Sequence, residues 1–152
     1  MTLGTPHCGY IHSNSKLLST GIWLAEKFTK DTILSQIRLS DATSIKETYL
    51  YGLSKEPCIS YFQKVILVGS KKDTYACLET STVQPSQQLR ELPASKSLMQ
   101  MQKRLLGQIA KCQVVRLNVN TVTKANTFDD YIGRQAHIQF IDNTEVIKLI
   151  FK

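Results

Sequence analysis

Hydrophobic positions along the chain alternate between strand-like and helix-like patterns. The continuous apolar run from Val65 to Gly69 predicts a parallel strand buried on both faces, and residues 114–119 form a second candidate strand. Residues 1–6 fit the end of another strand, because Pro6 cannot donate to a ladder. Between the two longer strands, helical spacing predicts a crossover helix that carries Leu98, Met101, Leu105 and Ile109. The alternation predicts one α/β unit with about three mostly parallel strands flanked by helices.

Four further helices are expected. Apolar positions recur at helical spacing over residues 15–29, and Asp31 is a candidate cap for a short helix with Ile33, Leu34 and Ile37 on one face. Ser44 and Glu47 have the spacing of a capping box. The helix that they begin would line up Ile45, Tyr49 and Leu53. Residues 144–151 predict a terminal helix that packs on the sheet, with Val146 above Ile150 and Ile147 above Phe151.

Length and charge narrow the class of protein. A chain of 152 residues suits a single domain, and its apolar runs are far shorter than the ~20 residues that span a bilayer. The first residues lack a basic region followed by an apolar one, so no secretory signal is expected. The net charge is +7, but no basic run is longer than a pair such as Lys71–Lys72. A solvated basic surface is therefore expected, and no nucleic-acid partner.

The cysteines and histidines predict neither disulfides nor a metal site. The four cysteines are widely separated, and Cys58 and Cys112 border strand-like segments where a thiol acts as small apolar filling. Reduced thiols favour a cytoplasmic location. The compact cluster of His7, Cys8 and His12 has no Cys-x-x-Cys or His-Glu-x-x-His partner, so no metal and no other cofactor is expected.

Candidate chemistry lies just beyond the predicted strands, where parallel sheets gather reactive groups. Asp73 comes four residues after Gly69, and His137 comes after the polar loop that follows the second candidate strand. An Asp and then a His, each in a loop after its own strand, is the order of the last two members of a Ser…Asp…His triad. Two plainer interpretations stay open: Asp73 as a turn former and His137 as a hydrogen-bonded structural residue.

The nucleophile of such a triad is missing from the chain. No Gly-x-Ser-x-Gly occurs, and the nearest string, residues 52–56, ends in Glu and lies in a predicted helix. Ser70 follows a strand but lacks a glycine two positions later. Serine activation needs that elbow, because it exposes the hydroxyl and aims a backbone N–H at the oxyanion. The chain by itself is therefore not expected to be a complete serine hydrolase.

Several segments resemble those of the putative serine esterase family, a group of lipase-like α/β-hydrolases. Residues 2–9 (TLGTPHCG) resemble its Leu-x-x-Pro-His-x-Gly, residues 20–24 (TGIWL) its Thr-Gly-Leu-Trp, and residues 48–55 (TYLYGLSK) its Thr-Phe-Leu-Tyr-x-Leu-Ser-Lys. Residues 61–70 (YFQKVILVGS) are similar to Tyr-Phe-Lys-Asn-Val-Val-Leu-Val-x-Ser, and Asp73 and Tyr75 fall on Ser-x-x-Asp-x-Tyr. Residues 132–138 (IGRQAHI) resemble Ile-Gly-Arg-Ala-Ala-His-Ile. The resembling segments thus extend over nearly the whole chain.

The resemblance implies that residues 1–152 are the C-terminal portion of one α/β-hydrolase domain, with the nucleophile-bearing half missing. Asp73 and His137 then take the acid and base places of a triad, and Tyr75 packs beside the acid loop without a chemical role. The implied reaction is hydrolysis of carboxylic esters, which include lipid acyl esters, and this implies a place in lipid metabolism. The site is expected to be inactive in the isolated chain.

Three partners are expected from this interpretation. They are a small-molecule or lipid ester, a peripheral membrane surface, and a protein that covers the sheet edge left open where the nucleophile strand would lie. Without that cover, the isolated chain is expected to be marginally stable or prone to aggregation. The competing interpretation is a non-catalytic interaction module on a hydrolase scaffold, since fold alone does not decide function.

Overall fold

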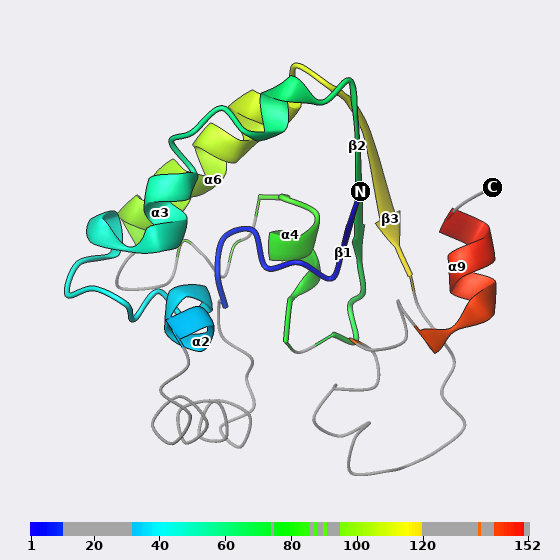
Figure 1. Ribbon diagram of the computed structural model, residues 1–152, viewed down its shortest axis with the longest axis horizontal. Helices are drawn as coiled ribbons and strands as arrows, with labels where there is room; N and C mark the ends of the chain where they lie inside the picture. The colour runs from blue at the N-terminus through cyan, green and yellow to red at the C-terminus, as the bar shows by residue number, and fades with distance from the viewer. Residues whose placement is uncertain are drawn as a thin grey trace, which may run out of the picture.

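The structure, a computed structural model, describes residues 1–10, 32–73, 75–85, 87, 90, 95–119, 137 and 142–150. Strands and helices alternate along the chain (Figure 1). Their bounds are β1 Thr2–Leu3, α2 Thr32–Ile37, the 3₁₀ turn η1 Ile45–Glu47, α3 Tyr49–Leu53, the 3₁₀ turn η2 Ile59–Tyr61, β2 Lys64–Gly69, α4 Leu78–Ser81, α6 Ser95–Ile109, β3 Gln113–Asn118 and α9 Thr144–Ile150. The predicted helix over residues 15–29 and the cap Asp31 lie outside the described residues.

The described strands form one parallel sheet in the order β1-β2-β3. Leu67 of β2 is opposite Thr2 on one side and Arg116 on the other, which makes β2 the central strand. Parallel neighbours need a crossover, and the segment with α4 and α6 provides the one between β2 and β3. The predicted class, a partial α/β fold with three parallel strands flanked by helices, is confirmed.

The central strand is buried on both faces, as its apolar run predicts. Successive side chains in a strand point to opposite faces, and both Leu67 and Val68 are 0% exposed. The neighbouring strand β3 carries no fully buried residue, because it has a partner on one side only within the described sheet. Because β2 is buried on both faces, its carboxyl end and the loop that follows it have a fixed position in the molecule.

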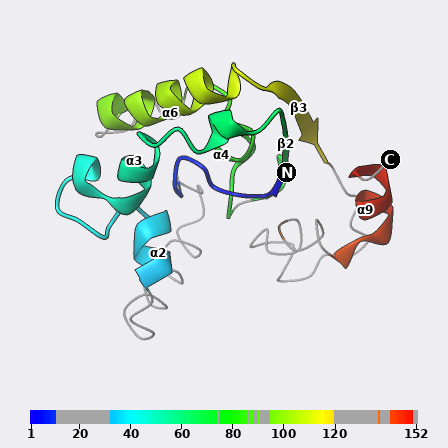
Figure 2. The same ribbon diagram turned by 45° about the horizontal axis from the view of Figure 1, so that its top comes forward.

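The main helix packs its predicted stripe into the core. The four positions at helical spacing in α6 are all buried, namely Leu98, Met101, Leu105 and Ile109. They join Val65 and Leu67 of β2 in one hydrophobic cluster. In both views, α2, α3, α4 and α6 lie on one side of the strands and α9 on the other (Figures 1 and 2). In the terminal helix, Val146 is buried. Ile150 and Phe151, which were expected to lie next to Val146 and Ile147, are outside the side chains that the structure describes.

The predicted capping box is wrong. The Ser44 side chain makes no capping hydrogen bond, and residues 45–47 form only a 3₁₀ turn before extended backbone at Thr48 interrupts the helix. The new helix α3 starts after that break, so four-residue spacing no longer keeps Ile45, Tyr49 and Leu53 on one face. Instead Tyr51 is buried, and its hydroxyl donates to Oε1 of Gln100 in α6 at 2.9 Å.

Two other side-chain expectations need correction. The short helix α2 is present, but Ile33 is 61% exposed and does not share a covered face with Leu34 and Ile37. Cys112 packs against the core as expected, whereas Cys58 is exposed and fills no apolar space. All four cysteines are free thiols.

The close packing of α4 on the end of β2 predicts a large effect of Gly69→Ala. An added Cβ would lie 3.0 Å from Cβ of Ser81 and from Cδ1 of Leu78, so α4 would have to move. Overpacking of this kind costs about 1–3 kcal/mol. The matched control is Gly107→Ala in α6, where a Cβ meets nothing within 4 Å and helix propensity improves by about 1 kcal/mol. Denaturant unfolding measures both, and a Gly69→Ala chain as stable as Gly107→Ala would contradict the packing argument.

Candidate active site

The loop after β2 holds Asp73 in a tight turn. The backbone N–H of Asp73 donates to the carbonyl oxygen of Ser70 at 3.3 Å, and the N–H of Lys72 donates to Oγ of Ser70 at 3.2 Å. The Asp73 carboxylate in turn accepts the backbone N–H groups of Tyr75 and Ala76 on Oδ1, at 2.8 and 3.0 Å. In turns, Asp side chains commonly accept hydrogen bonds from the backbone N–H groups of the residues that follow. The turn-forming interpretation of Asp73 is therefore correct, and it uses one carboxylate oxygen.

The second oxygen of Asp73 contacts His137. Nδ1 of His137 lies 2.7 Å from Oδ2 of Asp73, across 64 residues of sequence. The Asp73 side chain is 0% exposed and the His137 side chain 39% exposed. Because an ionised carboxylate only accepts hydrogen bonds, Nδ1 carries the proton and Nε2 is left as an acceptor. The structure thus brings together the two residues that the sequence singled out, in the geometry that prepares an imidazole to take up a proton.

Asp73 also changes the proton affinity of the imidazole. The hydrogen bond to Asp73 raises the pKa of His137 above its ordinary 6.5, and the negative charge of Asp73 adds to this, while partial burial opposes it. Tyr75 contacts the same ring, with the ring centroids 5.6 Å apart and the planes inclined by 33°. Tyr75 therefore touches both members of the pair, the carboxylate through its backbone and the imidazole through its ring.

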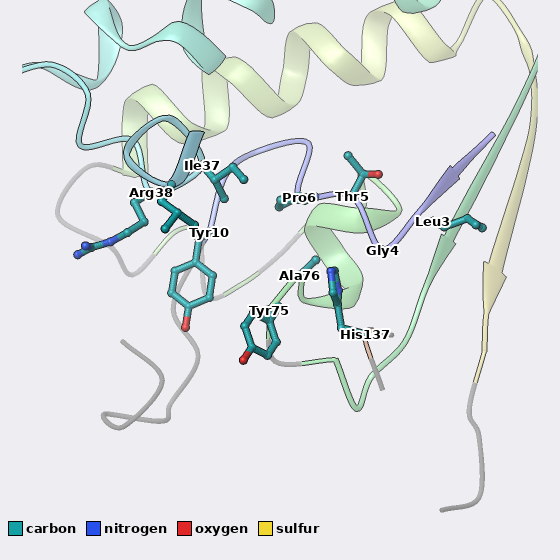
Figure 3. Close-up of a pocket in the computed structure, with 11 residues that line it drawn as sticks. Leu3, Gly4, Thr5, Pro6, Tyr10, Ile37, Arg38, Tyr75, Ala76 and His137 are labelled. Carbon is teal, nitrogen blue, oxygen red and sulfur yellow. The ribbon is translucent and has the colours of Figure 1, made fainter. Parts of the chain in front are cut away.

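His137 forms part of the wall of a pocket of about 350 Å³ (Figure 3). The pocket is lined by Leu3, Gly4, Thr5, Pro6, Tyr10, Leu34, Ile37, Arg38, Tyr75, Ala76 and His137. Most of these side chains are apolar, and Figure 3 shows the guanidinium of Arg38 directed away from His137. Enclosed apolar pockets with a few polar groups are the usual form of small-molecule sites. The Asp73–His137 pair thus opens onto a space that could hold a substrate.

Sequence reasoning did not predict most of the pocket lining. Tyr10, Leu34 and Ile37, for example, were not assigned to any site, yet they line the pocket, and Figure 3 shows Tyr10 and Ile37 across it from His137. The i, i+3 spacing of Leu34 and Ile37 predicted a helix face but not what that face covers. Nothing in the sequence indicated that this helix lies across from the loop after β2.

The cluster of His7 and Cys8 has a structural role. Nε2 of His7 lies 3.1 Å from Oγ1 of Thr2, and burial lowers the pKa of His7 from 6.5 to about 4. Burial, with a smaller effect of Cys77, raises the pKa of Cys8 to about 12, so this thiol is a poor nucleophile and a poor metal ligand. The described residues contain no group of three His, Cys, Asp or Glu that could hold a metal ion, and His12 is not among them.

The two serines considered as nucleophiles in the sequence, Ser54 and Ser70, are held by the backbone. The hydroxyl of Ser54, at the end of α3, donates to the carbonyl oxygen of Tyr51 at 2.7 Å and is buried. Ser70 is buried as well, and its Oγ accepts the N–H of Lys72. Neither has the exposed position of a nucleophile on a strand-to-helix turn.

The family comparison agrees with the resemblance over the first part of the chain. The model of the family described as Putative serine esterase (DUF676) matches residues 1–87, more than half of the chain. The chain belongs to this family. The matched residues of this esterase family member include β1, β2, Asp73 and Tyr75 and end before His137, so the place of His137 rests on the resemblance and on its contact with Asp73. No solved structure matches the chain.

None of the helices among the described residues combines the length and apolar character that crossing a bilayer requires.

Proposed function

We propose that this chain provides the acid and base of a serine esterase site that hydrolyses carboxylic esters, with the serine supplied by residues outside these 152. The observation that carries the proposal is the 2.7 Å hydrogen bond between Asp73 and Nδ1 of His137, which leaves Nε2 at the wall of an apolar pocket. Membership of the family supports a hydrolase site on this scaffold.

Each residue has a defined task in this mechanism. Nε2 of His137 takes the proton of the serine hydroxyl as its oxygen attacks the ester carbonyl carbon, and Asp73 stabilises the imidazolium that forms. The same proton then passes to the leaving alcohol, and an acyl-enzyme remains. A water molecule, deprotonated by His137, then attacks that acyl group. As the bond between the acyl carbon and the serine oxygen breaks, His137 returns the proton to the serine oxygen and the carboxylic acid is released. In such a triad the aspartate does not itself take up the proton, and the backbone N–H groups of Tyr75 and Ala76 hold the Asp73 carboxylate in place.

Hydrolysis of p-nitrophenyl butyrate tests this function. The assay compares the 152-residue chain with a longer polypeptide that includes upstream coding sequence. The longer polypeptide should turn over the ester and lose about 10³-fold or more of its rate on His137→Ala, whereas the chain alone should not exceed buffer. Lys148→Ala is the matched control, since Lys148 pairs only with Glu145 on the exposed face of α9 within the described residues. Turnover that survives His137→Ala would refute the assignment.

The second candidate function is a non-catalytic interaction module, favoured by the lack of any Gly-x-Ser-x-Gly in the sequence. Within the described sheet, β1 pairs with β2 alone, and its other edge is where a protein partner would add a strand. Lack of turnover in both polypeptides, together with a stable complex formed through this edge, would favour the module. For both functions, we propose a cytoplasmic location and contact with a membrane surface.

A further inference from the structure

The pocket beside His137 combines apolar side chains from distant parts of the sequence. Leu3 and Pro6 come from β1 and the turn after it, and Leu34 and Ile37 come from α2. Ala76 completes this apolar surface next to the imidazole (Figure 3). Transferring hydrocarbon from water to such a surface is favourable, and none of these five side chains can recognise a polar group. This part of the wall therefore favours a hydrocarbon group of the ligand.

The pocket has two distinct ends. Figure 3 shows His137 next to Ala76 and Tyr75, while Tyr10, Ile37 at the end of α2, and Arg38 lie at the other end. An ester whose carbonyl carbon is placed near Nε2 of His137 would extend one of its substituents toward α2. The acidic group nearest the imidazole, Asp73, is already hydrogen-bonded to it, and the guanidinium of Arg38 is directed away.

Building on the proposed function, we propose that this pocket takes the acyl chain of the ester, and that Leu34 and Ile37 set the longest chain that fits. A methylene group occupies about the room of a liquid water molecule, roughly 30 Å³, so a pocket of about 350 Å³ holds roughly ten such groups. The preferred substrates are esters of medium-length, unbranched fatty acids. Each buried methylene is worth about fourfold in binding until the chain reaches α2.

Binding of fatty acid anions to the chain tests the pocket without any need for catalysis. The probes are sodium butanoate, octanoate, dodecanoate and hexadecanoate, and the readout is NMR of labelled Leu and Ile methyl groups. Octanoate should bind at least about tenfold more tightly than butanoate and shift the methyl signals of Leu34 and Ile37. Dodecanoate should bind more tightly again, because its chain about fills the pocket, whereas hexadecanoate should gain less than about fourfold over dodecanoate, because its chain exceeds the pocket. Unshifted Leu34 and Ile37 signals at saturating octanoate would overturn the proposal.

Two substitutions in α2 distinguish an effect in the pocket from an effect elsewhere on the same helix. Ile37→Trp fills the end of the pocket and should weaken octanoate binding at least about tenfold while butanoate changes less than about twofold. Ile33→Trp is the control, since Ile33 is 61% exposed and does not line the pocket. Equal effects of the two substitutions would also overturn the proposal. If Ile37→Trp lowers the unfolding midpoint, Leu34→Phe repeats the test.

The failure of this inference differs from the failure of the proposed function. In the longer polypeptide, ester hydrolysis that requires His137 but is insensitive to acyl length and to Ile37→Trp would reject the acyl site and keep the esterase. Octanoate binding that Ile37→Trp abolishes, without ester hydrolysis, would reject the esterase and keep a site for hydrocarbon chains.

Discussion

Asp73→Asn should lower the rate of ester hydrolysis by roughly 10³–10⁴-fold in the longer polypeptide while leaving the fold intact. An Asn side chain keeps an oxygen for the backbone N–H groups of Tyr75 and Ala76, so the turn persists. Its amide nitrogen then faces Nδ1 of His137 and donates to it. The imidazole must carry its proton on Nε2, which leaves no acceptor for a serine hydroxyl. Steady-state kinetics measures the loss, which should lie in kcat.

The same substitution should change the titration of His137, and NMR of the imidazole can follow this in the 152-residue chain. The pKa should lie above 6.5 in the unmodified chain, because the hydrogen bond to Asp73 favours the imidazolium. In Asp73→Asn the hydrogen bond and the charge are lost and burial remains, so the pKa should fall to 6.5 or below. His7 is the internal control, since its pKa of about 4 comes from burial alone.

Linkage extends this prediction to stability. A histidine whose pKa is raised on folding stabilises the protein fully below pH 6.5, its unfolded value, and loses that contribution as the pH rises through the folded pKa. The free energy of unfolding of the unmodified chain should therefore exceed that of Asp73→Asn by more at pH 6 than at pH 9. His137 is partly exposed, which keeps the difference modest. A pH-independent difference, with an unchanged His137 titration, would refute the pairing.

The sheet and its main helix could be predicted because their patterns are local. A β-branched run as continuous as Val65–Val68 fits little other than a buried strand, and Leu98 and Met101 repeat at helical spacing through a long segment. The capping box failed because Ser44 and Glu47 have the right spacing while the backbone at Thr48 turns extended and breaks the helix. Spacing does not encode that bend, which tertiary packing of Tyr51 against α6 helps to stabilise.

The Asp73–His137 pair of the candidate site could be predicted from the sequence, whereas the pocket beside it could not. Asp73 and His137 each follow a strand, and the carboxyl ends of parallel strands share one edge, so topology alone favours their contact. The positions of Leu34 and Ile37 depend on how α2 docks, which involves contacts far apart in sequence. One such contact is the 2.7 Å hydrogen bond from the N–H of Tyr10 to the carbonyl oxygen of Ile37, and single-sequence periodicity carries no information about it.

Leu67→Ala should be the most destabilising single truncation in the sheet, at about 2–5 kcal/mol. Leu67 is 0% exposed, sits at the centre of the three strands, and packs in the core cluster with Met101 and Ile109. Removing the isopropyl group beyond its Cβ leaves a cavity, because the strands paired on both sides of β2 cannot close onto it. The loss is large against the ~5–15 kcal/mol that stabilises a typical domain.

Leu53→Ala is the matched control for this truncation, since it deletes the same atoms at a position that is 42% exposed and should cost less than about 1 kcal/mol. Urea unfolding followed by far-UV circular dichroism measures both variants. Because β2 leads directly into the Asp73 turn, Leu67→Ala should also broaden the NMR signals of His137, which Leu53→Ala should leave sharp. Equal midpoints for the two variants would show that β2 is not the centre of the core, and the rigid placement of Asp73 would then need another source.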